Sequence, residues 1–184
     1  IVFGDWSSDV CSSDLYLSKG DREKAIATFQ GVVAAAPKDP RGPYYLGVML
    51  KGANQAESAR QQFEKALAME PGYAEALDQL VLIDIASGNT DQALQRVLRQ
   101  SKIVPDSFEI QFILGSLYQK MERPEDAKQA FAKSLDINPG YARASVELSR
   151  IFMNTGRYPD AVGVLEKALR TRPSAGDEQL LMML

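Results

Sequence analysis

The chain has 184 residues, of which 45% are hydrophobic and 24% charged, and its formal net charge is -3. This composition is typical of a folded protein of one domain or of an array of small units. No apolar run approaches the roughly 18 residues that are needed to cross a bilayer, so we expect no membrane span in this fragment.

Several kinds of catalytic and metal site are excluded by the side chains that the sequence lacks. The chain has no His, which removes Ser-His-Asp and Cys-His nucleophile pairs and the HExxH zinc motif. Its single Cys, Cys11, allows neither an internal disulfide nor a cysteine metal cluster. No GxGxxG or GxxxxGK[ST] pattern is present. We therefore predict a chain that is not an enzyme and has no catalytic, cofactor-binding or metal-binding residues.

A period of 34 residues runs through the sequence without an insertion. It is marked by five prolines: Pro37, Pro71, Pro105, Pro139 and Pro173. Twelve residues before each Pro is an alanine: Ala25, Ala59, Ala93, Ala127 and Ala161. Eight residues before each Pro is a large apolar residue: Phe29, Phe63, Val97, Phe131 and Leu165.

Each period predicts two helices joined by a tight turn. The first helix carries apolar or small residues at i, i+1 and i+4, as in Leu46-Gly47 with Leu50, and the second carries the Ala and the large apolar residue four later. These spacings place one apolar stripe on each helix. At the turn the residues are Gly20, Asn54, Gly88, Glu122 and Gly156. Gly and Asn suit the left-handed residue that ends a helix, and each Pro ends a second helix.

These residues resemble the tetratricopeptide repeat (TPR) family, whose 34-residue unit has a small residue at position 8, Ala at 20, an aromatic at 24 and Pro at 32. The resemblance covers residues 16–184 and implies an all-α fold, a right-handed α-solenoid of stacked helix-turn-helix repeats. In this register the repeats are 6–39 (partial), 40–73, 74–107, 108–141, 142–175 and a truncated 176–184, which we call repeats 1 to 6. Positions 8 and 20 are where the two helices of a repeat cross, so only small residues let the backbones approach.

The beginning of the chain breaks the period. The first helix of repeat 1 is expected at 6–19, where "GDWSSDVCSSDL" has lost the apolar stripe. Asp5 to Leu15 matches, without a mismatch, the translation of a widely used short-read sequencing adapter. We therefore interpret residues 1–15 as a non-native leader that joins a genuine gene fragment near Tyr16. The alternative is a disordered leader rich in Ser and Asp.

This interpretation changes the charge balance of the genuine chain. Without Asp5, Asp9 and Asp14, its acidic residues number 24 minus 3, or 21, against 21 basic residues. A neutral surface favours a protein or peptide partner of unknown identity and argues against nucleic acid. The true N-terminus is interpreted as missing and the last repeat as cut, so the localisation stays open between the cytoplasm and the periplasm or envelope.

The resemblance also implies a binding groove. In the family, first-helix positions 2, 5, 9 and 12 line a concave face that holds an extended or helical peptide. The corresponding residues here are Arg41, Tyr44, Val48, Lys51, Glu75, Asp78, Leu82, Ile85, Glu109, Phe112, Ser116, Gln119, Arg143, Val146, Arg150 and Met153. We expect Tyr44 and Phe112 to be the anchors and Phe112→Ala to leave the fold intact. The alternative is that these positions are solvated or pack between repeats without a ligand.

The sequence favours a non-catalytic scaffold for protein–protein interaction, a fragment of a larger bacterial TPR protein that binds a peptide or protein segment in the groove. The alternative is the TPR region of a multidomain enzyme, such as a glycosyltransferase or a kinase, whose catalytic domain lies outside the fragment. Asp84 stands where the other repeats have an apolar residue. We expect it to turn to the edge of its repeat or to pair with Arg96 or Arg99; the alternative is a binding carboxylate.

Overall fold

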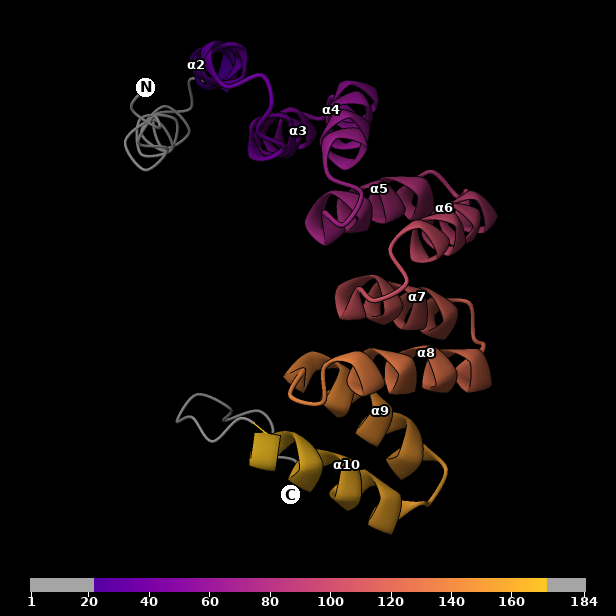
Figure 1. Ribbon diagram of the computed structural model, residues 1–184. Coiled ribbons are helices and arrows are strands. Elements are labelled where there is room, and N and C mark those ends of the chain that lie inside the picture. The colour runs from indigo at the N-terminus through magenta and orange to yellow at the C-terminus, as the bar shows by residue number, and fades with distance from the viewer. Residues whose placement is uncertain (1–21, 172–184) are drawn as a thin grey trace. The chain divides into compact units, whose positions relative to one another are not determined.

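The computed structural model describes residues 22–171, and every regular element in this range is an α-helix (Figure 1). The helices follow one another with short connections: α2 (Arg22–Ala35), α3 (Arg41–Gly52), α4 (Ala56–Met69), α5 (Ala74–Ala86), α6 (Thr90–Ile103), α7 (Phe108–Lys120), α8 (Pro124–Ile137), α9 (Ala142–Asn154) and α10 (Tyr158–Thr171). The predicted leader, 1–15, and the predicted truncated repeat, 176–184, lie outside the described residues.

The chain divides into two compact units, residues 1–88 and 89–184, which we call the N-terminal unit and the C-terminal unit. In the N-terminal unit, α2 packs on α3, α3 on α4 and α4 on α5. In the C-terminal unit, α6 packs on α7, α7 on α8, α8 on α9 and α9 on α10. Each unit is thus a stack of consecutive helices (Figure 1). This is the all-α helical-repeat fold that the sequence predicts.

The turns within the described repeats have the backbone that their residues predict. Asn54, Gly88 and Gly156 adopt positive φ angles of 60°, 76° and 71°. Glu122, which stands at the same phase, also has a φ of 57°, although an L side chain in this region costs about 1 kcal/mol or more. The turn geometry is therefore imposed by the repeat, and only three of the four turns have a residue that favours it.

Four second helices of the described range are followed by one of the periodic prolines. In each of them the last helical residue lies two positions before that Pro. The last helical residues of α2, α4, α6 and α8 are Ala35, Met69, Ile103 and Ile137. Pro lacks the N–H that the next turn needs and restricts the residue before it to extended backbone. The predicted role of Pro as a helix terminator is confirmed in these four places.

Glycines at position 8 allow the two helices of a repeat to touch closely. A Cβ atom added to Gly47 would lie 2.7 Å from Cε1 of Phe63, and one added to Gly115 would lie 2.6 Å from Cδ1 of Phe131. Both phenylalanines are fully buried. The predicted close approach at this position is confirmed in both repeats, and each ring occupies the space that a larger residue would need.

Asp84 on α5 is completely buried and forms an ion pair with Arg60 of α4. The Arg60 side chain is 14% exposed and its Nε lies 3.5 Å from Oε2 of Glu57. The hydrogen bond to Asp84 raises the pKa of Arg60. The expected position of Asp84 at the edge of the repeat is therefore wrong. The structure adds a partner, Arg60, that the sequence analysis did not name.

Candidate peptide-binding surfaces

The first helices of repeats 2 and 3 carry half of the predicted groove residues. We call this set the N-terminal surface: Arg41, Tyr44, Val48 and Lys51 on α3, and Glu75, Asp78, Leu82 and Ile85 on α5. The two helices are joined by a hydrogen bond of 2.7 Å from Nζ of Lys51 to Oε1 of Gln79. Leu82 is 43% exposed, whereas Tyr44, Val48 and Ile85 are half-buried. Apolar and charged side chains thus share one surface.

An aromatic pair lies at the start of α5. The rings of Tyr44 and Tyr73 meet edge to face, with centroids 5.2 Å apart and an interplanar angle of 63°. The Tyr44 ring also lies 5.3 Å from that of Tyr45 and 5.8 Å from that of the buried Phe63. Such contacts hold Tyr44 in one position on the core.

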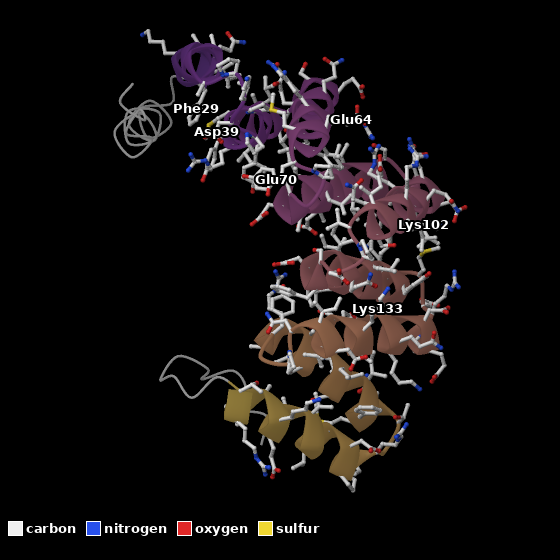
Figure 2. All side chains as sticks on the ribbon, viewed as in Figure 1. Phe29, Asp39, Glu64, Glu70, Lys102 and Lys133 are labelled. Carbon is white, nitrogen blue, oxygen red and sulfur yellow. The ribbon has the colours of Figure 1, made fainter. Side chains whose placement is uncertain are left out.

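The negative charges of nearby carboxylates act on this aromatic pair. Burial raises the pKa of Tyr44, and the negative charges of Glu75 and Asp78 raise it further. Burial and then Glu75 likewise raise the pKa of Tyr73, with a smaller contribution from Glu70, which lies in the connection before α5 (Figure 2). The charge of Arg41 also interacts with Tyr73, so carboxylates and one guanidinium both act on this aromatic pair.

Arg41, the basic residue at the start of α3, is held there by Asp39 (Figure 2). Its Nη2 lies 2.6 Å from Oδ2 of Asp39, and its Nε donates to Oδ1 at 3.0 Å. Oδ1 also accepts a hydrogen bond from the backbone N–H of Arg41. The side-chain hydrogen bond from Arg41 lowers the pKa of Asp39 below its ordinary value. This role of Asp39 was not predicted from the sequence.

The first helices of repeats 4 and 5 carry the other half of the predicted residues. We call this set the C-terminal surface: Glu109, Phe112, Ser116 and Gln119 on α7, and Arg143, Val146, Arg150 and Met153 on α9. Nε2 of Gln119 donates to Oε2 of Glu147 at 3.3 Å, and the same carboxylate accepts from Nη1 of Arg150 at 3.1 Å. Gln119 and Glu147 are 28 residues apart, like Lys51 and Gln79.

Two other residues of the C-terminal surface bond within their own helix or its cap. The hydroxyl of Ser107 accepts from the backbone N–H of Ile110 at 3.2 Å and caps α7. The same hydroxyl donates to Oε2 of Glu109 at 3.0 Å, so this carboxylate lies at the positive end of the helix. Ser116 donates to the carbonyl of Phe112 one turn earlier.

The predicted exposure of Phe112 and Val146 is wrong. Phe112 is 8% exposed, and its ring lies 5.6 Å from that of the buried Phe131. Val146 is 4% exposed and belongs to a core cluster with Leu165 and Ala168. The physical reason is that the stacked helices of the C-terminal unit bury position 5. Neither side chain is available as a surface anchor.

A cation covers Phe112 from the next first helix. Cζ of Arg143 lies 4.5 Å from the centroid of the Phe112 ring, a distance at which a guanidinium is attracted to an aromatic face. Tyr141 meets the same ring edge to face, with centroids 5.4 Å apart and an angle of 87°. The predicted surface residue Arg143 is therefore engaged in a contact that buries Phe112.

An open cavity of about 330 Å³ lies at the turn end of the C-terminal unit. It is lined by Gln119, Glu122, Pro124, Ile151, Asn154 and Thr155. Gln119 belongs to the C-terminal surface, so the cavity borders that surface. Glu122, Pro124 and Thr155 were not predicted as lining residues, because they follow the first helices and only the turn geometry of the repeat brings them there.

The described part of the chain offers no group of three or more His, Cys, Asp or Glu that could hold a metal ion. Nor do residues 22–171 contain a helix that is both long and apolar enough to cross a membrane.

Family models described as tetratricopeptide repeats match almost the whole sequence. One matches residues 50–117 and 118–183, and another matches residues 13–74. The chain belongs to the tetratricopeptide repeat family. Members of this family bind protein or peptide partners, which agrees with the coarse function that the sequence predicts.

Three TPR proteins illustrate the likeness. The type IV pilus assembly protein PilF of Pseudomonas aeruginosa is 24% identical over 148 residues, which are 79% of this chain and 59% of that protein. This chain therefore spans little more than half the length of that relative. The structure of PilF is similar with a TM-score of 0.65 over 96% of this chain and 80% of that one.

A thermophilic TPR protein of Thermus thermophilus has a TM-score of 0.66 at 18% identity, over 96% of this chain and 95% of that one. YrrB, described as a TPR protein with an unusual peptide-binding site, has a TM-score of 0.56 at 20% identity, over 92% and 86% of the two chains. At this identity the likeness concerns the fold alone.

Proposed function

We propose that this TPR array is a non-catalytic scaffold that binds a protein or peptide segment on the surfaces of its first helices. The observation that carries the proposal is the N-terminal surface, where the exposed Leu82 shares α5 with Glu75 and Asp78, and where Lys51 joins α5 to α3, the helix of Tyr44. An exposed apolar side chain beside fixed aromatic and charged groups is typical of an interaction site.

The burial of Phe112 and Val146 changes which residues are proposed to touch the partner. In the N-terminal surface these are Arg41, Tyr44, Val48, Lys51, Glu75, Asp78, Leu82 and Ile85. In the C-terminal surface these are Glu109, Ser116, Gln119, Arg143, Arg150 and Met153. The N-terminal surface is the more acidic and apolar, and the C-terminal surface the more basic, so charge is proposed to orient a partner segment on each surface by itself.

The near balance of acidic and basic residues supports a protein partner over nucleic acid, since a nucleic-acid site needs a basic excess. Peptide binding by a fold relative, YrrB, adds support by analogy of fold. The alternative, a repeat region that serves a multidomain enzyme, uses the same surfaces for the same kind of contact. One experiment on the binding surface therefore addresses both.

Selection of 12-residue peptides from a display library against the whole chain, followed by backbone amide NMR of the chain with each selected peptide, tests the proposal. We expect shifts in α3 and α5 or in α7 and α9. Leu82→Asp should weaken binding of peptides that map to α5 by about ten-fold. Val162→Asp on α10, where the side chain is 41% exposed, is the matched control and should leave that binding unchanged. Shifts confined to α4, α6, α8 and α10 contradict the proposal.

A further inference from the structure

The chain builds the same aromatic pair twice, once in each unit. Tyr44 and Tyr73 are 29 residues apart, as are Phe112 and Tyr141. The ring centroids lie 5.2 Å apart in the first pair and 5.4 Å apart in the second, and both pairs meet edge to face. The repeat register therefore places an equivalent aromatic surface at the start of α5 and at the start of α9.

The residue two places after the second ring of each pair, Tyr73 or Tyr141, differs in charge between the two units. After Tyr141 comes Arg143, whose guanidinium carbon lies 4.5 Å from the centre of the Phe112 ring. After Tyr73 comes Glu75, an exposed carboxylate that cannot act as a cation on an aromatic face. The C-terminal unit thus supplies a cation to its own aromatic pair, and the N-terminal unit supplies an anion at the equivalent place.

The negative charge around the first pair is reinforced by a second substitution. Asp78 stands where the C-terminal unit has Val146, and both Glu75 and Asp78 act electrostatically on the Tyr44 phenol. Arg41 of the same surface is bound to Asp39 through two side-chain nitrogens. An aromatic face with carboxylates beside it attracts a cation through the ring quadrupole and through the charges together.

We propose that the Tyr44–Tyr73 pair, with Glu75 and Asp78 beside it, receives an Arg or Lys side chain of the protein or peptide that binds the N-terminal surface. The inference rests on the proposed scaffold function and names the chemistry of the partner at this surface. The place that Arg143 fills within the chain at Phe112 is filled at Tyr44 by the partner. Arg fits better than Lys because its planar guanidinium stacks on a ring and also binds carboxylates.

A probe without sequence preference tests the site directly. The whole chain, with ¹³C-labelled tyrosine rings and ¹⁵N-labelled amides, is titrated with N-acetylarginine amide and separately with its neutral isostere, N-acetylcitrulline amide. We expect the ring signals of Tyr44 and Tyr73 to shift saturably, with the arginine compound binding about five-fold more tightly or better. Equal binding of the two compounds, or shifts only elsewhere in the chain, overturns the proposal.

Variants at the two carboxylates separate a specific site from general attraction of a cation. Glu75→Gln combined with Asp78→Asn removes both charges at nearly constant shape and should bring the preference for arginine below about two-fold. Glu75→Arg places a cation where Arg143 stands in the other unit and should abolish the Tyr44 response. Glu166→Gln in the exposed pair with Arg170 is the control and should keep the full preference. An unchanged preference in the Glu75 variants overturns the proposal.

The scaffold proposal and the cation site fail in different ways. Selected peptides that map to α3 and α5 without an Arg or Lys near Tyr44, together with no response to N-acetylarginine amide, overturn the cation site alone. Selected peptides that map only to second helices overturn the scaffold proposal, whatever the tyrosine rings show.

Discussion

The aromatic pairs at Tyr44 and at Phe112 show how one repeat position serves two purposes. Tyr44 is half-buried among carboxylates, whereas Phe112 is 8% exposed and covered by the guanidinium of Arg143. The two pairs follow the same register, and the side chain two residues beyond the second ring has the opposite charge, Glu75 in one unit and Arg143 in the other. In our proposal, one charge reversal, Glu75 against Arg143, separates a surface that attracts a partner's cation from one where Arg143 already lies on the ring.

The largest expected effect is a difference in stability between variants of the two rings, because Phe112 lies deeper in the core than Tyr44. Phe112→Ala should lower the free energy of unfolding by about 3–5 kcal/mol through a cavity beside Phe131. Tyr44→Ala should cost only about 1–2 kcal/mol because less of the ring is removed from the interior. Urea unfolding followed by circular dichroism checks both variants. A loss for Phe112→Ala no larger than that for Tyr44→Ala would mean that position 5 is equally open in the two units.

A second difference between the units concerns position 11, where α5 has Asp84 and α9 has Phe152. Arg60→Met removes a partner of the fully buried Asp84 and should cost about 3 kcal/mol of stability. Arg157→Met should cost under about 1 kcal/mol, because Arg157 lies over the Phe152 ring and pairs with an exposed carboxylate. The double change Arg60→Met with Asp84→Leu should recover most of the loss.

Thermal unfolding of these three variants checks the position 11 prediction. If Arg60→Met lowers stability as little as Arg157→Met does, the buried Arg60–Asp84 ion pair stabilises the fold no more than an exposed ion pair. If the double variant is as unstable as Arg60→Met alone, the cost comes from packing and not from an uncompensated charge.

The contact between the two helices of a repeat is the feature that the units share, and its disruption should cost the same in both. Gly47→Ala and Gly115→Ala each place a Cβ within 3 Å of a buried phenylalanine ring and should cost about 1–2 kcal/mol after the gain in helix propensity. Phe131→Leu should partly rescue Gly115→Ala, since repeat 5 combines Ser149 with Leu165. Denaturant midpoints measure all of these, and a neutral Gly115→Ala would rule out the close approach.

The smallest expected effect compares two helix starts. Asp39→Asn should cost under about 1 kcal/mol at pH 7, because the pair with the exposed Arg41 is screened by solvent. The pKa of Asp39 is lowered in the folded chain, so its contribution is present above the unfolded value, near 3.8, and is lost as the pH falls through the lower folded value. Ser107→Ala at α7 removes a cap whose bond from the backbone N–H of Ile110 does not titrate, so its cost should change less with pH than that of Asp39→Asn.

Urea midpoints of the wild type, of Asp39→Asn and of Ser107→Ala at pH 7 and at pH 3 test this difference. The predicted result is a gap between the wild type and Asp39→Asn that narrows at pH 3 more than the gap for Ser107→Ala does. Constant gaps for both would show that the carboxylate charge of Asp39 does not matter.

The sequence predicts the features that recur in every repeat. The 34-residue period predicted the left-handed turns at Asn54, Gly88 and Gly156, the helix ends before the prolines and the close contact at Gly47 and Gly115. Each depends on local backbone physics or on the volume of one side chain, so one residue type at one phase is a sufficient signal.

Contacts that occur once in the array were not predictable in the same way. The pairing of Asp84 with Arg60 joins position 11 of repeat 3 to position 21 of repeat 2, and no other described repeat has this combination of residues. The role of Tyr73 and Tyr141 was also missed, because both residues lie just before the first helices from which the groove residues were taken. The signal that could have found it is an aromatic residue 29 places earlier in both repeats, Tyr44 and Phe112.

The central claim is that the charge beside each aromatic pair decides where a cation binds, and exchanging the two charges tests it most directly. The variant Glu75→Arg with Arg143→Glu keeps the net charge of the chain. In titrations with N-acetylarginine amide followed on ¹³C-labelled tyrosine and phenylalanine rings, the account predicts that the saturable shift moves from Tyr44 and Tyr73 to Phe112 and Tyr141. A shift that stays at Tyr44, or that disappears from both pairs while the circular dichroism spectrum remains helical, would contradict it.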